Sequence, residues 1–274
     1  MKIIKADKSL EEFEPEKLKN SLLKSGATKD LAEEIFLHIQ KELRDGMSTS
    51  QIYKHASFLL KKQFRKVEVS YSLRKAVMEL GPTGFPFERF VGEILKERGY
   101  EVKIGEILKG HCASHELDVV AYNENKLILV EAKYHNGLGT KSDIKTALYV
   151  KARFDDLKDE KYFFGKKRKV NENWLITNTK FTSSAIQYGS CAGINMISWN
   201  YPAKGNLQDI IEDSDLHPIT SIQSLSTSQK RALLSQNVVL CRKLRDNYDA
   251  MKSAGLSNEE IEKVSKEITL ISDN

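Results

Sequence analysis

Apolar residues recur at two different spacings along this chain of 274 residues. Over residues 1–80 they return every three or four positions, which is the spacing of an amphipathic helix. Three such stretches precede residue 60, and a fourth, "YSLRKAVMEL", ends at residue 80. A short strand at Ile3–Ile4 comes before them. The pattern predicts a mainly helical N-terminal domain over residues 1–80.

The segment "GPTGFP" interrupts this pattern, because two prolines and two glycines cannot continue a helix. An amphipathic helix follows, with Phe90, Ile94 and Leu95 on its apolar face. Three strands, a helix, a strand, a helix and a strand are expected after it, up to about residue 200. This order predicts an α/β (α+β mixed) fold over residues 81–204, with a mixed central β-sheet flanked by helices.

Residues 205–274 return to helical spacing and are expected to form a small helical C-terminal appendage. Ser and Thr stand where helices would begin in "SLSTSQKRALL" and "GLSNEEIEKV". The first of these segments lies in a stretch that faintly resembles a helix-hairpin-helix but lacks the glycines of that motif. Core packing of its apolar residues is the preferred interpretation, for Ile219, Ile222, Leu225, Leu233 and Leu234.

Charged residues stand inside the most apolar stretch of the chain, "ELDVVAYNENKLILVEAKYHNG". Side chains alternate along a strand, so Glu131 and Lys133 share a face, roughly 7 Å apart. A hairpin centred between Glu124 and Asn125 pairs residues whose numbers sum to 249, which sets Asp118 opposite Glu131 with β-carbons about 5 Å apart. Four apolar residues then lie on the other face, against a helix: Val119, Ala121, Val130 and Ala132.

Two carboxylates held this close repel each other, which raises the pKa of one of them unless a counter-charge is near. Mg²⁺, or Mn²⁺ in its place, is a hard cation that proteins hold through one or two carboxylates, water and substrate phosphates. Lys133 beside it could orient or deprotonate an attacking water, or stabilise charge on a phosphate. The triplet predicts a phosphodiester-cleaving site with Asp118 and Glu131 as metal ligands. The alternative is an ordinary cross-strand charge cluster on a solvated face.

The segments "GPTGFPFERFVGEILKERGYEV", "HELDVVAY" and "LVEAKYHNG" resemble the Mrr-like branch of the PD-(D/E)xK restriction-endonuclease superfamily, over residues 81–200. The resemblance implies that Glu88, Asp118, Glu131 and Lys133 form a catalytic site that cuts DNA with Mg²⁺. Glu131 stands where many Mrr-like members have glutamine, so the chain follows the broader superfamily there. Apart from the resemblance, a glutamate in the first turn of a helix is explained by the helix dipole alone.

Residues 1–80 resemble the ATP-cone, a nucleotide-sensing module of ribonucleotide reductases and their transcriptional repressor, in "IIKADKSLEEFEPEKLKNSLLKSGA", "DGMSTSQIYK" and "YSLRKAV". The resemblance implies that Ile3, Lys5 and Lys17 contact an adenine nucleotide, ATP or dATP. Two ammonium groups on neighbouring elements can clamp a triphosphate. The Arg-Asp-Gly of the family reads Ala-Asp-Lys at residues 6–8, which removes a bidentate phosphate donor. The alternative is an interaction or dimerisation domain with solvated lysines.

Two further segments carry candidate chemistry. "GHCASH" brings His111, Cys112 and His115 together, but a structural zinc site needs four ligands and no second pair stands at a suitable spacing. His115 and His135 could instead reach a scissile phosphate. "GKKRKV" at residues 165–170 is expected to be a basic loop, either solvated or in contact with DNA phosphates.

Composition narrows the class of protein. Apolar residues make up 40% of the chain, enough for a core, and a net charge of +5 favours polyanionic partners only weakly. No apolar run approaches the roughly 20 residues that cross a bilayer. The N-terminus lacks the pattern of a signal peptide, and three separated cysteines give no disulfide framework. We therefore expect a cytoplasmic protein without a membrane partner.

The leading interpretation is a divalent-metal-dependent DNA endonuclease regulated by ATP or dATP. A non-cleaving regulator that binds DNA and senses the nucleotide is the alternative, although the complete Asp, Glu and Lys set argues for an enzyme. A nuclease whose N-terminal domain forms a homo-oligomer is the third interpretation.

Overall fold

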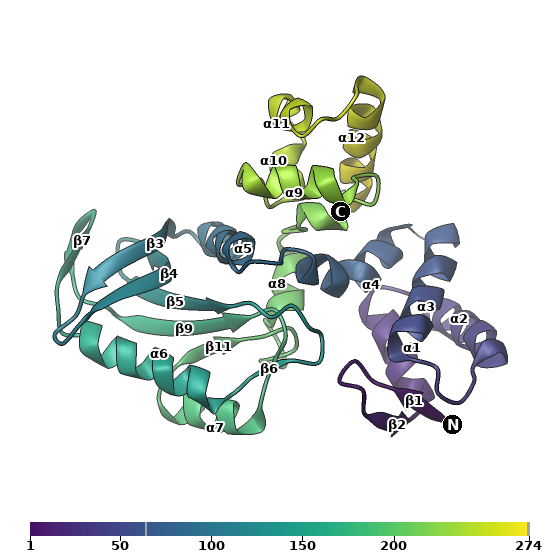
Figure 1. The fold of residues 1–274 in the computed structure, drawn as a ribbon, viewed down its shortest axis with the longest axis horizontal. Coiled ribbons are helices and arrows are strands. Elements are labelled where there is room, and N and C mark those ends of the chain that lie inside the picture. Colours follow the sequence, from purple (N-terminus) through teal and green to yellow (C-terminus); the bar gives the residue numbers. More distant parts are fainter. Residues whose placement is uncertain (64, 273–274) are drawn as a thin grey trace.

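The chain forms a mixed β-sheet with its own helices, and its two ends form separate helical parts beside this sheet (Figure 1). The computed structural model describes the backbone of residues 1–63 and 65–272, and the side chains of residues 1–60 and 71–272. The mixed α/β class that the hydrophobic pattern predicts is confirmed. Within the described ranges, no helix combines the length and the apolar character that crossing a bilayer requires.

The N-terminal part is a two-stranded hairpin packed on helices. Its elements are β1 (Lys2–Ile4), β2 (Leu10–Glu12), α1 (Pro15–Lys24), α2 (Lys29–Glu42), α3 (Thr49–Gln63) and α4 (Arg65–Met78). Thr28 starts α2 by accepting a hydrogen bond from the Leu31 N–H at 3.3 Å. The helical stripes meet in one core that includes Leu22, Ile39 and Ala56. The helices that the spacing predicts therefore form.

The central part is built on a five-stranded sheet in the order β11-β9-β5-β4-β3, with β3, β4 and β5 antiparallel and β5, β9 and β11 parallel. Its main elements are α5 (Phe85–Glu97), β3 (Glu101–Lys109), β4 (Ser114–Tyr122), β5 (Leu127–Lys133), α6 (Ile144–Leu157), β9 (Glu172–Thr177), α7 (Ser183–Cys191) and β11 (Asn195–Ile197). The sheet is mixed because a hairpin is followed by crossovers through α6 and α7, and such crossovers give parallel neighbours.

The β4–β5 hairpin has the register expected from its sequence, since Val119 lies opposite Val130 and Tyr122 lies opposite Leu127. The face that carries Val119 and Val130 packs on Phe90 of α5. The opposite face packs with the end of α6, and α5 and α6 lie on the two sides of the sheet (Figure 1). Burial of both faces explains why these strands are so rich in Val, Leu and Ile.

Two short strand pairs accompany the sheet. β6 (Lys141–Ser142) runs parallel to β10 (Lys180–Phe181). β7 (Tyr162–Phe164) and β8 (Lys166–Arg168) form a hairpin that turns at Gly165, whose φ is +70°. The expectation of a loop at residues 165–170 is therefore wrong in part, because Lys166–Arg168 form a strand. Their charged side chains fit there because most of this strand is exposed to water.

The C-terminal part is helical, as expected. It comprises α8 (Leu207–Asp213), a 3₁₀ turn η1 (Ile219–Ser221), α9 (Thr227–Ser235), α10 (Cys241–Leu244), α11 (Tyr248–Ser253) and α12 (Asn258–Ser272). The residues expected to pack inside it are buried, among them Ile219 and Leu233. This core is continuous with that of α5, and the hydroxyl of Thr220 donates to the carbonyl of Ala76 in α4 at 2.6 Å.

Candidate active site

β4 and β5 separate at the end of their ladder. They pair over residues 119–122 and 127–130, and the last three residues of β5, Glu131–Lys133, pair with β9 alone. The edge of β5 that faces β4 is therefore open at this point. Asp118 fills it, because its Oδ2 accepts a hydrogen bond from the backbone N–H of Ala132 at 2.7 Å. A side-chain carboxylate thus takes the place of a main-chain carbonyl where the two strands fork.

The regular alternation of β4 breaks at Asp118. Leu117 packs on the α6 side of the sheet, whereas Val119, two residues on, packs on the α5 side. On the neighbouring strand β3, Gly105 stands at this level with a φ of +68°, and the ladder resumes on either side of it. Glycine adopts that conformation without strain. The local distortion lets the Asp118 side chain reach β5.

Glu131 points to α6. Its Oε2 lies 2.9 Å from Nη1 of Arg153, and only 14% and 8% of the two side chains are exposed. The Arg153 guanidinium also donates to the hydroxyl of Tyr149 at 3.3 Å and lies 5.0 Å from the centre of its ring. Sequence reasoning missed Arg153. The signal was a cation that interrupts an apolar stripe of α6 running through Val150 and Leu157.

Glu88 lies in the first turn of α5 and is half-buried. Burial raises the pKa of its carboxyl to about 7, with repulsion from Asp118, Glu131 and Glu116 acting in the same direction and Arg89 opposing them. Glu88 therefore shares one electrostatic environment with two of the predicted site residues. Glu116, two residues before Asp118 on β4, is a further acid of this group that the sequence reasoning did not single out.

Asp118 is half-buried as well. Burial, followed by repulsion from Glu131, raises the pKa of its carboxyl to about 6, although the Ala132 N–H, Arg153 and Lys133 act in the opposite direction. The two carboxyls at this edge thus lose their protons at higher pH than free carboxylic acids do. Raised pKa values of this kind are expected where carboxylates crowd together and the nearby cations do not balance their charge. Negative charge therefore exceeds positive charge at the fork.

Lys133 ends β5 with its side chain exposed, and it forms no ion pair with any other residue that the structure describes. His135, two residues on, is held in place. Its Nε2 lies 2.8 Å from the Ser142 hydroxyl, and its backbone N–H donates to Oδ1 of Asn178 at 2.8 Å. Burial and then the charge of Lys133 lower the pKa of His135, whereas Asp143 raises it. Its imidazole is therefore neutral at neutral pH.

Glu88 and the two predicted metal ligands, Asp118 and Glu131, do not form a closed set of three in this conformation. The ligand oxygens of Glu88, Asp118 and Glu131 do not all lie within 4.8 Å of one another. Asp118 uses one oxygen on a backbone amide, and Glu131 uses one oxygen on a guanidinium. The other oxygen of each carboxylate has no protein donor among the described residues. The site is open rather than preassembled.

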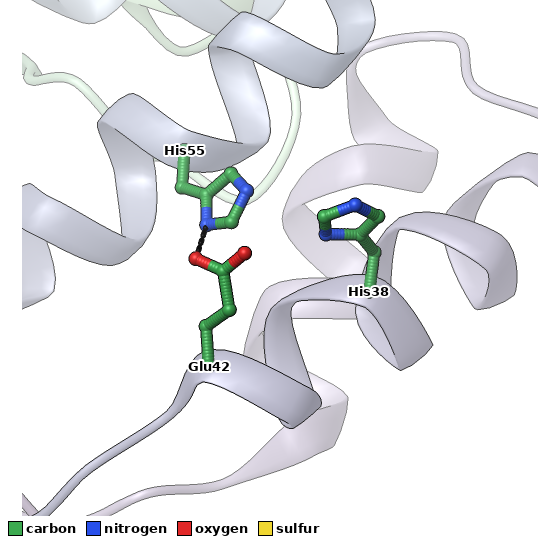
Figure 2. A group of neighbouring side chains, drawn as sticks. All are labelled: His38, Glu42 and His55. Atoms are coloured by element: carbon green, nitrogen blue, oxygen red, sulfur yellow. Dashed lines mark ion pairs between the residues drawn. The ribbon is translucent and has the colours of Figure 1, made fainter.

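Among the side chains that the structure describes, one group of histidine and glutamate residues does meet within that distance, in the N-terminal part (Figure 2). His38 and Glu42 lie one turn apart on α2, and His55 faces them from α3. Nδ1 of His55 lies 3.3 Å from Oε2 of Glu42, and the two histidine rings pack edge to face with centroids 5.2 Å apart. These contacts connect the end of α2 to α3. The sequence analysis did not single out any of the three residues.

The "GHCASH" loop is organised by Asp156 of α6. Its carboxylate accepts hydrogen bonds from the backbone N–H groups of Cys112 at 2.7 Å and Ala113 at 3.1 Å. Nε2 of His115 lies 2.7 Å from the same carboxylate. His115 first, and then these amides, hold the pKa of Asp156 well below its usual range. His115 is thus engaged in a structural contact, which explains the loop without a phosphate.

The residues predicted to bind nucleotide surround one carboxylate. Ile3 is buried in β1. Nζ of Lys5 lies 2.6 Å from Oε2 of Glu11, and Lys17 contacts Oε1 of the same residue. Lys17 also pairs with Glu14 at 2.7 Å. Hydrogen bonds from Lys17 and Lys5 lower the pKa of Glu11 to about 2. The structure therefore brings the two predicted lysines together, with their charges largely balanced.

Three family models match successive parts of the chain. Residues 1–76 match the ATP cone domain, residues 82–200 match the restriction endonuclease family, and residues 217–272 match the family described as AF1548-like, C-terminal. The first two matches confirm the resemblances drawn from the sequence. Together they define a protein that combines a restriction-endonuclease-like domain with an ATP cone domain.

A protein of Archaeoglobus fulgidus, described as uncharacterized, is 32% identical over 175 residues, which cover 64% of this chain and 95% of that protein. The crystal structure of the protein of unknown function AF1548 has a TM-score of 0.58 at 28% identity, over 70% of this chain and 100% of that chain. The chain belongs to the AF1548-like family. Can2 from Sulfobacillus thermosulfidooxidans, solved with cyclic tetra-adenylate, reaches a TM-score of 0.31 at 14% identity over 73% and 54% of the two chains, too low to bear on function.

Proposed function

We propose that the chain is a divalent-metal-dependent endonuclease that hydrolyses phosphodiester bonds in DNA, and that ATP or dATP regulates it. One observation carries the proposal, the fork of β4 and β5 where Asp118, Glu131 and Glu88 crowd negative charge beside Lys133. Half-buried charge of one sign is costly, and the packing of the sheet does not require it. The restriction endonuclease match over residues 82–200 supports this edge as the reaction centre.

The residues at the fork fit a hard divalent cation. Asp118 and Glu131 offer carboxylate oxygens, which Mg²⁺ and Mn²⁺ prefer as ligands. The pKa of Asp118 is raised to about 6 and that of Glu88 to about 7, which reflects an excess of negative charge at the fork. A bound cation would balance this charge. We assign metal binding to Asp118 and Glu131. The metal would supply a Lewis acid that stabilises charge on the phosphate.

Lys133 and Glu88 complete the proposed catalytic group. The exposed ammonium of Lys133 has no acidic partner in the described part of the chain, so a phosphate oxygen or an attacking water can approach its Nζ. Glu88, with a pKa of about 7, exchanges a proton near neutral pH and can orient water. We assign catalytic roles to Glu88, Asp118, Glu131 and Lys133.

An adenine nucleotide is the proposed effector, supported by the ATP cone match over residues 1–76. We assign its binding to Ile3, Lys5 and Lys17. The two ammonium groups already converge on Glu11, and the oxygens of a phosphate group would accept the same charge-assisted hydrogen bonds. Lys5 and Lys17 therefore mark the phosphate end of the nucleotide.

Cleavage of supercoiled plasmid DNA tests the proposal. We expect wild type to cut with Mg²⁺ or Mn²⁺ and to stop when EDTA is added. Asp118→Asn and Lys133→Met should remove cutting, whereas Glu124→Gln, at the exposed hairpin turn, should not. ATP or dATP should change the wild-type rate. Cutting by Asp118→Asn at the wild-type rate would reject the site, and a rate indifferent to both nucleotides would reject the regulation.

The Glu131–Arg153 ion pair favours a second candidate function. A regulator that binds DNA and senses the nucleotide without cutting needs no metal, and Arg153 would then be the permanent counter-ion of Glu131. DNA binding that responds to nucleotide, without cleavage of duplex, single-stranded or branched DNA by Mg²⁺ or Mn²⁺, would establish that function instead.

A further inference from the structure

Three cations gather where the N-terminal part meets the central sheet, and we name Arg74, Lys141 and Lys180 the interface cations. Lys141 and Lys180 lie directly opposite each other in the β6–β10 pair. Like charges placed this way destabilise strand pairing. Arg74 of α4 has its Nε buried without a hydrogen-bond partner among the residues whose side chains are described. Within the described ranges none of the three forms an ion pair, so no carboxylate balances their charge.

The loop between β5 and β6 touches the β1–β2 hairpin, and the two lie side by side in Figure 1. A β-carbon placed on Gly139 would lie 3.1 Å from the backbone nitrogen of Asp7. The two backbones are therefore in contact. Asp7 is two residues past Lys5, and Gly139 is two residues before Lys141. This contact brings lysines of the N-terminal and central parts into one region.

The electrostatics of Lys180 agree with this placement. Its side chain keeps contact with solvent, but desolvation by the surrounding protein lowers its pKa. Repulsion from Arg74, Lys141, Lys5 and Lys17, in that order, lowers the pKa further. Cations from both parts of the chain therefore lie close enough to repel one another across the boundary.

Acids of the N-terminal part are already engaged in contacts within that part. Glu11 contacts both Lys5 and Lys17, and Glu14 contacts Lys17. Asp7 accepts a hydrogen bond from the backbone N–H of Ser9 at 3.0 Å. No acid among the described residues pairs with an interface cation. A region with this excess of positive charge is suited to an anion that reaches both parts.

We propose that the interface cations bind the phosphates of the same nucleotide that Lys5 and Lys17 bind, so that the nucleotide joins the N-terminal part to the catalytic part. This inference rests on the proposed nucleotide binding and names the groups through which the effector reaches the reaction centre. A triphosphate is a compact anion, which suits cations that converge from separate segments. A duplex presents its charge along a line, and suits a stripe of cations instead.

Both interface lysines are joined to the strands of the candidate active site. Lys180 follows β9, whose Thr177 pairs with Lys133 at the end of β5. Lys141 ends the loop that begins after Lys133. Phosphates held between Lys141 and Lys180 would fix both connections at once. Nucleotide binding would therefore set the position of the end of β5, where the proposed catalytic lysine stands.

Titration calorimetry on the full chain tests the inference, with ATP, dATP, inorganic tripolyphosphate and adenosine as ligands. We expect Lys141→Gln and Lys180→Gln each to weaken ATP and tripolyphosphate binding by roughly 10-fold, the effect of losing one charge-assisted hydrogen bond. Adenosine binding should stay unchanged in both variants. Lys103→Gln, on the exposed side of edge strand β3, is the matched control and should bind all four ligands like wild type.

The outcomes separate this inference from the proposed function. Wild-type affinity for ATP in both variants would overturn the shared site and leave nucleotide regulation standing. A wild-type chain that binds neither ATP nor dATP would overturn both. Variants that lose affinity for duplex DNA but keep their affinity for ATP would assign the interface cations to the substrate strand, and that result would also overturn the shared site.

Discussion

Nη1 of Arg153 lies 2.9 Å from Oε2 of Glu131, and both side chains are nearly buried between α6 and the sheet. Removing one partner of a buried pair leaves an uncompensated charge, which typically costs about 3–5 kcal/mol. Arg153 therefore supplies the protein's own counter-charge to Glu131. Glu131, a proposed metal ligand, is thus stabilised by Arg153, and a bound metal would share the Glu131 carboxylate with this arginine.

Arg153→Met is expected to lower the free energy of unfolding by about 3 kcal/mol, because Glu131 is left without its counter-charge. Mg²⁺ should recover part of this loss, since the cation compensates the same carboxylate. Denaturant unfolding with and without Mg²⁺ measures both effects. Arg153→Lys keeps the charge and serves as the control, with a smaller loss. An Arg153→Met variant that Mg²⁺ fails to stabilise would contradict a metal at Glu131.

The pKa values at the fork give the stability of the metal-free protein a defined pH dependence. The pKa of Asp118 is about 6 in the folded chain, against about 4 when unfolded. Between these values the folded chain holds a proton that the unfolded chain has released, so stability falls as pH rises. Glu88, with a folded pKa of about 7, extends the fall to neutral pH.

Asp118→Asn is therefore expected to stabilise the metal-free protein at pH 8 by on the order of 1–2 kcal/mol, and to have little effect near pH 4. Asparagine keeps an oxygen that can accept the Ala132 N–H, so the hydrogen bond at the fork survives. Thermal unfolding of wild type and variant across this pH range is the measurement. Glu124→Gln should show no such pH dependence. A variant that is less stable than wild type at pH 8 would refute the excess of negative charge.

Lys133→Met should separate catalysis from binding. Losing a cation that acts on the reacting phosphate is expected to cost about 10³-fold in the cleavage rate. DNA affinity should change only a few-fold, because one phosphate contact among many is lost. Single-turnover cleavage and gel-shift titration on the same DNA give the two numbers. Lys103→Met should alter neither, and equal losses in rate and affinity would make Lys133 a binding residue only.

The register of the β4–β5 hairpin could be predicted because strand alternation and a short turn leave one arrangement that buries Val119 and Val130 together. The same argument brought Asp118 and Glu131 to one end of the hairpin. The structure adds that the ladder stops one residue short of them. The catalytic roles and the divisions at residues 80 and 204 stay predictions.

The contacts that Asp118 and Glu131 make at the fork could not be predicted, because the residues that shape them come from distant parts of the chain. Arg153 reaches Glu131 only through the packing of α6, and the distortion at Asp118 depends on Gly105 of another strand. Local spacing carries no information on such contacts. The approach of Gly139 to Asp7 is of the same kind, since it depends on how the N-terminal part docks.

Glu11 holds Lys5 and Lys17 with one carboxylate, so it competes with phosphate for both ammonium groups. Glu11→Gln removes the negative charge and leaves a neutral side chain of the same size. We expect ATP and tripolyphosphate to bind about 5-fold more tightly to this variant, since an exposed ion pair contributes modestly. The gain should shrink as salt is added, because salt screens exposed charges.

Titration calorimetry at low and high salt measures this gain. Glu16→Gln is the control, because Glu16 lies 3.8 Å from Lys19 and, among the described residues, forms no ion pair with either nucleotide lysine. Its affinity for ATP should equal that of wild type. Weaker ATP binding by Glu11→Gln than by wild type would mean that Glu11 orients the two lysines for the nucleotide, and that the phosphates and this carboxylate occupy the site together.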